Sequence, residues 1–196
     1  MGRAEGRSCV APGATKTAAG RLPGDLTKDE LIERIIRVDH AGEFGAKRIY
    51  EGQLAVLRGK PEAQAIEHMY AQELEHLRTF EKLMVERRAR PSPLHPLWNA
   101  AGFALGAATA LLGPKAAMAC TVAVEEVIDQ HYRQQSEKLG ADEAPLKAKI
   151  DKFRAEELQH RDAGLEHGAE QAPAYPLLTG AIKAGSRLAI WLAERI

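Results

Sequence analysis

The most regular feature of the sequence is the return of apolar residues every three or four positions, the spacing of one face of an α-helix. The first such stretch starts behind the capping-box pattern Thr27-Lys-Asp-Glu30 and stops before Gly59. Pro61 and Pro114 stand where a helix favours proline, in its first turn, and Gly140 follows the fourth stretch. The sequence therefore predicts an all-α protein, with helices over residues 28–58, 61–88, 97–112, 114–139, 143–166 and 177–195.

Two of the apolar stripes contain a single glutamate on their inner side. Glu43 lies seven residues after Ile36 and seven before Tyr50, so these three side chains share one helix face. In the fourth stretch, Glu125 shares the apolar stripe with Tyr132. A buried carboxylate destabilises a fold unless its charge is balanced. The pattern therefore predicts a cation partner inside the protein.

Two further stripes carry the unit Glu-x-x-His, at Glu73–His76 and Glu157–His160. Residues three apart on a helix project from one face, so a carboxylate and an imidazole at this spacing can bind one metal ion. A single unit is explained equally well as a local pair on the helix surface. Two units combined with two single glutamates match the ligand set of di-iron and di-manganese sites in ferritin-like bundles.

The four glutamates also form a concealed repeat. Glu73 follows Glu43 by 30 residues, and Glu157 follows Glu125 by 32. We therefore expect two similar helix pairs related by an approximate two-fold axis, with four carboxylates and two imidazoles between them. Two divalent ions would balance the four negative charges. A ligand set dominated by carboxylates favours iron or manganese over zinc.

Other polar residues nearby lie off the inner stripes. Glu75, Glu126 and Glu156 are expected to matter less than the neighbouring ligand candidates. Asp39 and Asp129 each lie one turn from a single glutamate, where each is a candidate to hydrogen-bond a ligand histidine. The remaining predictions are rim or surface positions for His40 and His131, surface positions for His68, His95 and His167, and a core position for Cys120.

Composition narrows the class of protein. The 196 residues include 27 basic and 27 acidic side chains, a balance that argues against general binding to nucleic acid. Cys9 and Cys120 are too few and too far apart for a disulfide framework, which favours a reducing compartment. Residues 1–24 are rich in small and basic residues, so we expect a disordered tail before a domain over residues 25–196. An organelle transit peptide is the alternative for the tail.

One long segment stands out as uncharged, since Pro91 to Pro114 contains no Asp, Glu, Lys or Arg. The helix expected over residues 97–112 would be about 24 Å long, which is short for crossing a bilayer. Three alternatives are open: a buried core helix or hairpin, a segment that dips into a membrane surface, and a true membrane span. The last expected helix is amphipathic and carries Trp191 on its apolar side.

Several longer motifs extend around these positions. They are Val38-Asp-His-Ala-Gly-Glu43-Phe-Gly-Ala, Glu73-x-x-His76, Ala116-Ala-Met-Ala-Cys-Thr-Val-Ala-Val-Glu125-Glu, Phe153-Arg-x-Glu-Glu157-x-x-His160 and Ala172-Pro-Ala-Tyr175. Together they resemble the 5-demethoxyubiquinone hydroxylase family, ferritin-like di-iron carboxylate monooxygenases of ubiquinone biosynthesis. The resemblance covers about residues 26–196. It implies a ferritin-like antiparallel four-helix bundle with two additional apolar or amphipathic helices for membrane contact.

The resemblance also implies a set of site residues. The family's iron ligands fall on the six residues that helical geometry selects, namely Glu43, Glu73, His76, Glu125, Glu157 and His160. A histidine and a tyrosine of the family pattern match His131 and Tyr132, which become candidates for positions behind the ligands. The implied cofactors are two iron ions, with molecular oxygen as co-substrate. An external electron donor is also implied, and a reduced pyridine nucleotide is one candidate.

The implied activity is the hydroxylation of a polyprenylated demethoxyubiquinol by a protein bound peripherally to a membrane surface, without a nucleic-acid partner. The expected place is the cytoplasmic face of a bacterial cell membrane, with the matrix face of the mitochondrial inner membrane as the alternative. A homo-oligomer and partner proteins of ubiquinone biosynthesis are left open. Two other classes compete: a ferritin-like protein that oxidises or stores iron, and a non-enzymatic helical scaffold associated with a membrane.

Overall fold

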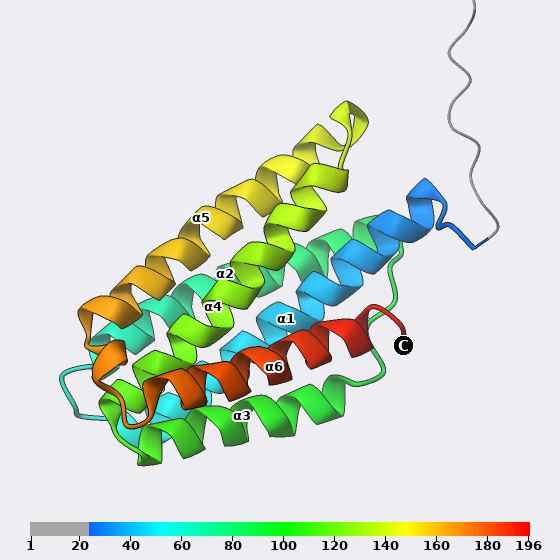
Figure 1. The fold of residues 1–196 in the computed structure, drawn as a ribbon. Coiled ribbons are helices and arrows are strands. Elements are labelled where there is room, and N and C mark those ends of the chain that lie inside the picture. Colours follow the sequence, from blue (N-terminus) through cyan, green and yellow to red (C-terminus); the bar gives the residue numbers. More distant parts are fainter. Residues whose placement is uncertain (1–23) are drawn as a thin grey trace, which may run out of the picture.

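The computed structural model describes residues 24–196, which form six α-helices and two short 3₁₀ turns (Figure 1). The predicted all-α class is confirmed, and each predicted helix end lies within two residues of the observed one. The predicted disordered tail falls almost wholly on residues 1–23, outside the described part. The helices are α1 (Lys28–Leu57), α2 (Ala63–Arg87), α3 (His95–Leu111), α4 (Pro114–Lys138), α5 (Ala144–Glu166) and α6 (Tyr175–Ala193).

The start of α1 is fixed by the capping box that the sequence predicts. The backbone N–H of Glu30 donates to the Thr27 hydroxyl at 3.2 Å, and the Glu30 carboxylate accepts from the Thr27 backbone N–H at 2.7 Å. Helix α2 begins at Ala63, two residues later than Pro61 suggests. It ends where Arg88 adopts the left-handed conformation.

Four long helices form two antiparallel hairpins, α1 with α2 and α4 with α5 (Figure 1). The long connection between the hairpins contains α3, which is the arrangement of a ferritin-like bundle with one crossover. Helices α3 and α6 each pack on both α1 and α4. They thus cover one side of the α1–α4 pair, while α2 and α5 lie on the other side.

Two apolar clusters fill the bundle on either side of its middle. One contains Ile36, Phe80, Tyr132, Ile150 and Phe153 among other buried residues. The other contains Tyr50, Ile66, Met69, Met118 and Val122 among others. Each bundle helix contributes an apolar turn to these clusters before and after its glutamate. The middle of the bundle is therefore a polar layer that lies between two apolar layers.

Glycines set the distance between α3 and α1. A Cβ at Gly106 would fall on the backbone carbonyl of Ile49, and one at Gly52 would fall on that of Phe103. The two backbones approach so closely that these positions have no room for a side chain. One face of α3 is therefore buried, whereas Leu97 and Leu111 lie on its exposed side.

The uncharged segment thus combines features of two of its alternatives. Its helix is packed against the bundle along one stripe, as a core helix would be, and it leaves apolar residues exposed on the other side. Within residues 24–196, no helix has both the length and the apolar character required to cross a bilayer.

Replacing Gly106 with Ala should destabilise the protein by about 1–3 kcal/mol, because the new methyl group forces α3 away from α1. Gly180→Ala is the matched control, since a Cβ at this position of α6 meets no atom within 4 Å. Removing a helix-interior glycine there should stabilise by roughly 0.5–1 kcal/mol. Thermal unfolding of the two variants measures both effects, and a neutral Gly106→Ala would contradict the close packing.

Candidate metal centre

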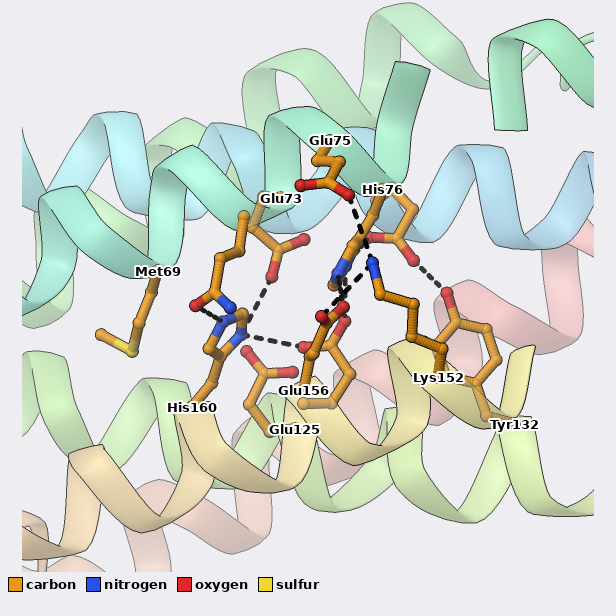
Figure 2. A network of polar contacts seen from close by, with 12 residues as sticks. Met69, Glu73, Glu75, His76, Glu125, Tyr132, Lys152, Glu156 and His160 are labelled. Carbon is orange, nitrogen blue, oxygen red and sulfur yellow. Dashed lines mark hydrogen bonds and ion pairs between the residues drawn. The ribbon is translucent and has the colours of Figure 1, made fainter. Parts of the chain in front are cut away.

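The structure brings together the six residues that the sequence selects as metal ligands. Helix α1 contributes Glu43, α4 contributes Glu125, and α2 and α5 each contribute one Glu-x-x-His unit (Figure 2). All six side chains belong to residues that are at most 3% exposed. They meet in the polar layer between the two apolar clusters. Their assignment as metal ligands stays a prediction.

The six residues form two overlapping groups, in each of which the candidate ligand atoms lie within 4.8 Å of one another. Glu73 and Glu157 belong to both groups. Glu43 and His76 complete the first group, which we call the His76 half; Glu125 and His160 complete the second, the His160 half. The geometry therefore suits two adjacent ions, with the two shared carboxylates between them and the other residues at the ends.

Both histidines direct the same ring nitrogen toward the carboxylates. His76 Nδ1 lies 3.5 Å from Glu43 and 3.1 Å from Glu157. His160 Nδ1 lies 3.2 Å from Glu73 and 3.0 Å from Glu157. Both Nε2 atoms point away from the cluster, so Nδ1 is the nitrogen available to a metal ion in each ring.

The outward nitrogens find partners on the opposite helix of the α2–α5 pair. His76 Nε2 lies 2.8 Å from a carboxylate oxygen of Glu156, and His160 Nε2 lies 3.0 Å from the amide oxygen of Gln72. Both partners are acceptors here, so each ring carries a proton on Nε2. When Nδ1 is not protonated, its lone pair then faces the carboxylate cluster.

Two tyrosines hold the terminal carboxylates across the bundle. The hydroxyl of Tyr50, on α1, donates to Glu125 on α4 at 2.9 Å. The hydroxyl of Tyr132, on α4, donates to Glu43 on α1. Each tyrosine lies seven residues after the single glutamate of its own helix and bonds the single glutamate of the other. The approximate two-fold relation predicted for the ligands therefore extends to the groups behind them.

The donor set fits a pair of metal ions. Both carboxylate oxygens of Glu73, one oxygen each of Glu125 and Glu157, and Nδ1 of His76 are buried and make no hydrogen bond of regular geometry among the described residues. Their nearest polar neighbours are other atoms of the same cluster, such as His76 Nδ1 and Glu157 at 3.1 Å. Unpaired buried polar atoms are costly and rare, and these face one another. Coordination of divalent ions would use the lone pairs, and the carboxylate-rich set suits iron or manganese.

Burial and neighbouring charges shift the pKa values of carboxyls in the cluster. Burial raises the pKa of Glu73 well above its usual range, and the charges of Glu157 and Glu43 add to the rise. Burial likewise raises the pKa of Glu125. Burial opposes ionisation of Glu157 too, but hydrogen bonds from His160 and His76 lower its pKa to about 2. Binding of metal ions would therefore be coupled to the release of protons from the cluster.

His76 is the basic counterpart of these carboxyls. Burial alone would lower its pKa, but hydrogen bonds and charge from Glu157 and Glu43 raise the value to about 12. The neighbouring carboxylates therefore favour the protonated form of this ring. Loss of the Nδ1 proton would be a condition for binding a metal ion.

Several predictions for residues around the site are wrong. Asp129 accepts a hydrogen bond from Arg154 at 2.7 Å, and Asp39 accepts one from Gln135 at 2.6 Å, so neither bonds a ligand histidine. The hydrogen-bond partner of each aspartate lies on a neighbouring helix, and the periodicity of a single helix does not predict contacts between helices. Of the two positions taken from the family pattern, Tyr132 contacts a ligand candidate, whereas His131 contacts Gln135 at 2.8 Å.

The remaining histidines divide between surface and interior. His68 and His167 are exposed, as expected. His40 is buried at 7% exposure and its ring stacks on that of His95, which also packs on Phe44. A plain surface position is therefore wrong for His95, because the start of α3 folds back over α1. Cys120 is fully buried in the core, as predicted.

The three glutamates expected to matter less than the ligand candidates all lie outside the six-residue cluster. Glu75 has a mostly exposed side chain, and Glu126 lies outside the cluster, paired with Lys183. Glu156 is different, because its carboxylate reaches His76, and Gln72 has the same relation to His160. Both residues directly precede a ligand glutamate in the sequence, and that shared position is the signal that could have identified them.

A partly open cavity of about 340 Å³ lies between the α1–α4 pair and the covering helices α3 and α6. Its walls come from α1, α3, α4 and α6 and are almost entirely apolar. Gly42 and Ala46 line it beside Glu43, and Val124 lines it beside Glu125. Side chains at Gly42 and Gly45 would meet no atom within 4 Å, so the cavity owes part of its volume to these glycines.

Comparison with known proteins identifies the family of the chain. Residues 30–193 match the family described as ubiquinone biosynthesis protein COQ7. A Rhodospirillum rubrum protein named 3-demethoxyubiquinol 3-hydroxylase is 63% identical over 182 residues, covering 92% of this chain and 86% of its own.

Eukaryotic relatives are similar over comparable lengths. The human NADPH-dependent 3-demethoxyubiquinone 3-hydroxylase, named as mitochondrial, is 52% identical over 199 residues, covering 97% of this chain and 91% of its own. The Saccharomyces cerevisiae protein, named mitochondrial 5-demethoxyubiquinone hydroxylase, is 44% identical over 183 residues, covering 85% of this chain and 78% of its own. The resemblance drawn from the motifs is confirmed, and the chain belongs to the COQ7 family of ubiquinone biosynthesis proteins.

Proposed function

We propose that the protein is a di-iron, oxygen-dependent hydroxylase that acts on the ring of a polyprenylated demethoxyubiquinol in ubiquinone biosynthesis. The observation that carries the proposal is the buried cluster of four glutamates and two histidines with unpaired lone pairs. Family membership and the hydroxylase names of the relatives support it. The proposed target is the ring carbon that lacks its oxygen substituent, which those names number as 3 or 5.

The bound iron pair would supply the activation of molecular oxygen. The chain's own residues fix the geometry: Glu73 and Glu157 would be shared between the ions, with a terminal glutamate and a histidine Nδ1 at each end. Tyr50 and Tyr132 hold the terminal carboxylates in place through their hydroxyl protons. The apolar clusters above and below keep bulk water from the reacting layer. The electron donor we propose is a reduced pyridine nucleotide, in line with the human relative's name.

The apolar cavity is the proposed site for the substrate. Its almost entirely apolar walls suit the first isoprene units of a polyprenyl tail, which carries no polar group. The cavity is lined by residues of α1 and α4 that are next in sequence to Glu43 and Glu125. These two helices separate the cavity from the cluster. We therefore propose that the quinol ring reaches the centre by passing between α1 and α4, at the part of α1 where Gly42 and Gly45 carry no side chains.

A lipid-bound tail requires an entrance that faces lipid. The exposed apolar residues of α3, of its C-cap and of α6 are Leu97, Leu111, Leu112, Leu177, Leu188 and Trp191. These two helices also form the outer walls of the cavity. We propose that this surface, the α3–α6 apolar face, rests on a membrane, with the cytoplasmic face of a bacterial cell membrane as the leading location. The similarity to a bacterial relative supports the bacterial location. The matrix face of the mitochondrial inner membrane is the alternative, in line with the relatives named as mitochondrial.

Glu157→Ala should remove bound iron and abolish product formation, because Glu157 belongs to both halves of the centre. The assay is complementation of a strain blocked at this hydroxylation, with quinones measured by mass spectrometry and iron measured in the purified protein. Glu166→Ala, at an exposed position of the same helix, should behave as wild type. A wild-type protein that binds iron but does not restore ubiquinone would favour iron storage instead.

Gly45→Leu should lower kcat/KM for a demethoxyubiquinol at least about tenfold, since the isobutyl group occupies the cavity and displaces the tail. Iron content should stay at the wild-type level because no ligand moves. Gly180→Leu introduces the same side chain on α6 at an open position outside the cavity walls, and should retain activity. An active Gly45→Leu enzyme would exclude the cavity as the substrate site.

The double substitution Leu188→Glu with Trp191→Glu should reduce binding to phosphatidylcholine vesicles about tenfold in a co-sedimentation assay. Both side chains are about half exposed on α6, so the change removes apolar area and adds charge at the proposed contact. Val85→Glu changes an even more exposed apolar residue on α2 and should leave vesicle binding as it is. Equal losses in the two proteins would contradict the α3–α6 apolar face as the membrane surface.

A further inference from the structure

We infer that the two halves of the metal centre are inequivalent, and that Glu156 and Gln72 make them so. In this assignment the His76 half binds its metal ion first and more tightly than the His160 half. Glu156 and Gln72 act as positioning residues, through the histidines and without contact to the ions. The inference rests on the proposed function, because it assumes that the cluster holds two metal ions.

The inequivalence arises at matching positions of the internal repeat. Gln72 directly precedes Glu73, and Glu156 directly precedes Glu157. Each accepts a hydrogen bond from Nε2 of the histidine on the other helix, at 3.0 Å for Gln72 and 2.8 Å for Glu156. The repeat therefore preserves the position and the hydrogen bond, but one partner is an amide and the other a carboxylate.

The terminal carboxylates, their tyrosine partners and the metal-facing histidine nitrogens are of the same chemical type in the two halves. The terminal carboxylates are both glutamates, and each receives a tyrosine hydroxyl from the opposite hairpin. Both histidines present Nδ1 to the carboxylate cluster. The difference behind the two histidines is therefore a specific break in an otherwise matched pair of ligand sets.

A cation network holds the carboxylate of Glu156 in place (Figure 2). Lys152, one turn earlier on α5, lies 3.4 Å from Glu156 and 3.2 Å from Glu75 on α2. The lysine ties Glu156 to the rim of α2, the helix that carries His76. The contact with Lys152 limits the movement of the Glu156 carboxylate away from the ring.

The chemical consequence follows from the charge of the acceptor. A hydrogen bond to a carboxylate is stronger than one to an amide, and it leaves more electron density on the metal-binding nitrogen. Loss of such a partner behind a ligand histidine typically lowers metal affinity about 10–100-fold. His76 should therefore be the stronger donor of the two histidines, which gives the His76 half the higher affinity.

Stepwise loading of the metal-free, full-length protein with Co²⁺ tests the inference. Calorimetry would give the affinities, and cobalt absorption would report each ligand environment as it fills. The wild-type protein should show two resolved steps. Glu156→Gln, which changes charge with little change in shape, should weaken the first step about tenfold or more and bring the two steps together. Gln72→Glu should strengthen the second step.

The exchanged variant, Glu156→Gln with Gln72→Glu, is the sharpest form of the test, because the two absorption signatures should appear in reversed order. Glu67→Gln on the exposed face of α2 is the control and should change neither step. Two equal steps in the wild type, or a Glu156→Gln variant in which both steps weaken alike, would overturn the inference and leave the di-metal function standing. A wild-type protein that binds no Co²⁺ and no Fe²⁺ would overturn the proposed function itself.

Discussion

Charge balance inside the bundle is the constraint on which the rest of the structure depends. Four carboxylates lie in a layer that is closed above and below by apolar side chains, where ionised groups are stable only with cations or protons beside them. The inward Nδ1 atoms, the tyrosine hydroxyls and the unpaired oxygens are all arranged around that requirement. A pair of divalent ions would satisfy it, because the candidate ligand atoms of each group lie within 4.8 Å of one another.

The inner set of residues could be predicted from sequence because helix periodicity decides which side chains face the bundle axis. Glu73 and Glu75 are two positions apart, yet one is buried and the other exposed, as their helical phase requires. Contacts between helices are a different matter, since they depend on how far apart the helices lie and how they are rotated. Asp129 finds Arg154, and Glu156 finds His76, through packing that no single-helix pattern contains.

The apolar segment shows the same division between composition and packing. Its lack of charge was compatible with a core helix, a membrane-dipping segment or a membrane span. The role of its glycines becomes visible only in the packing of α3 against α1. Gly52 and Gly106 bring two backbones together, whereas Gly42 and Gly45 leave space open. The same residue type thus closes the contact of α3 with α1 in one place and widens the cavity in another.

The crossed tyrosine bonds have a consequence for how the chain assembles. Tyr50 belongs to the first hairpin and bonds a carboxylate of the second, while Tyr132 does the reverse. In an isolated hairpin the terminal glutamate would be hydrated, and docking of the two hairpins replaces that water with a tyrosine hydroxyl from the other hairpin. The crossed bonds therefore make the burial of each terminal carboxylate dependent on correct docking of both hairpins.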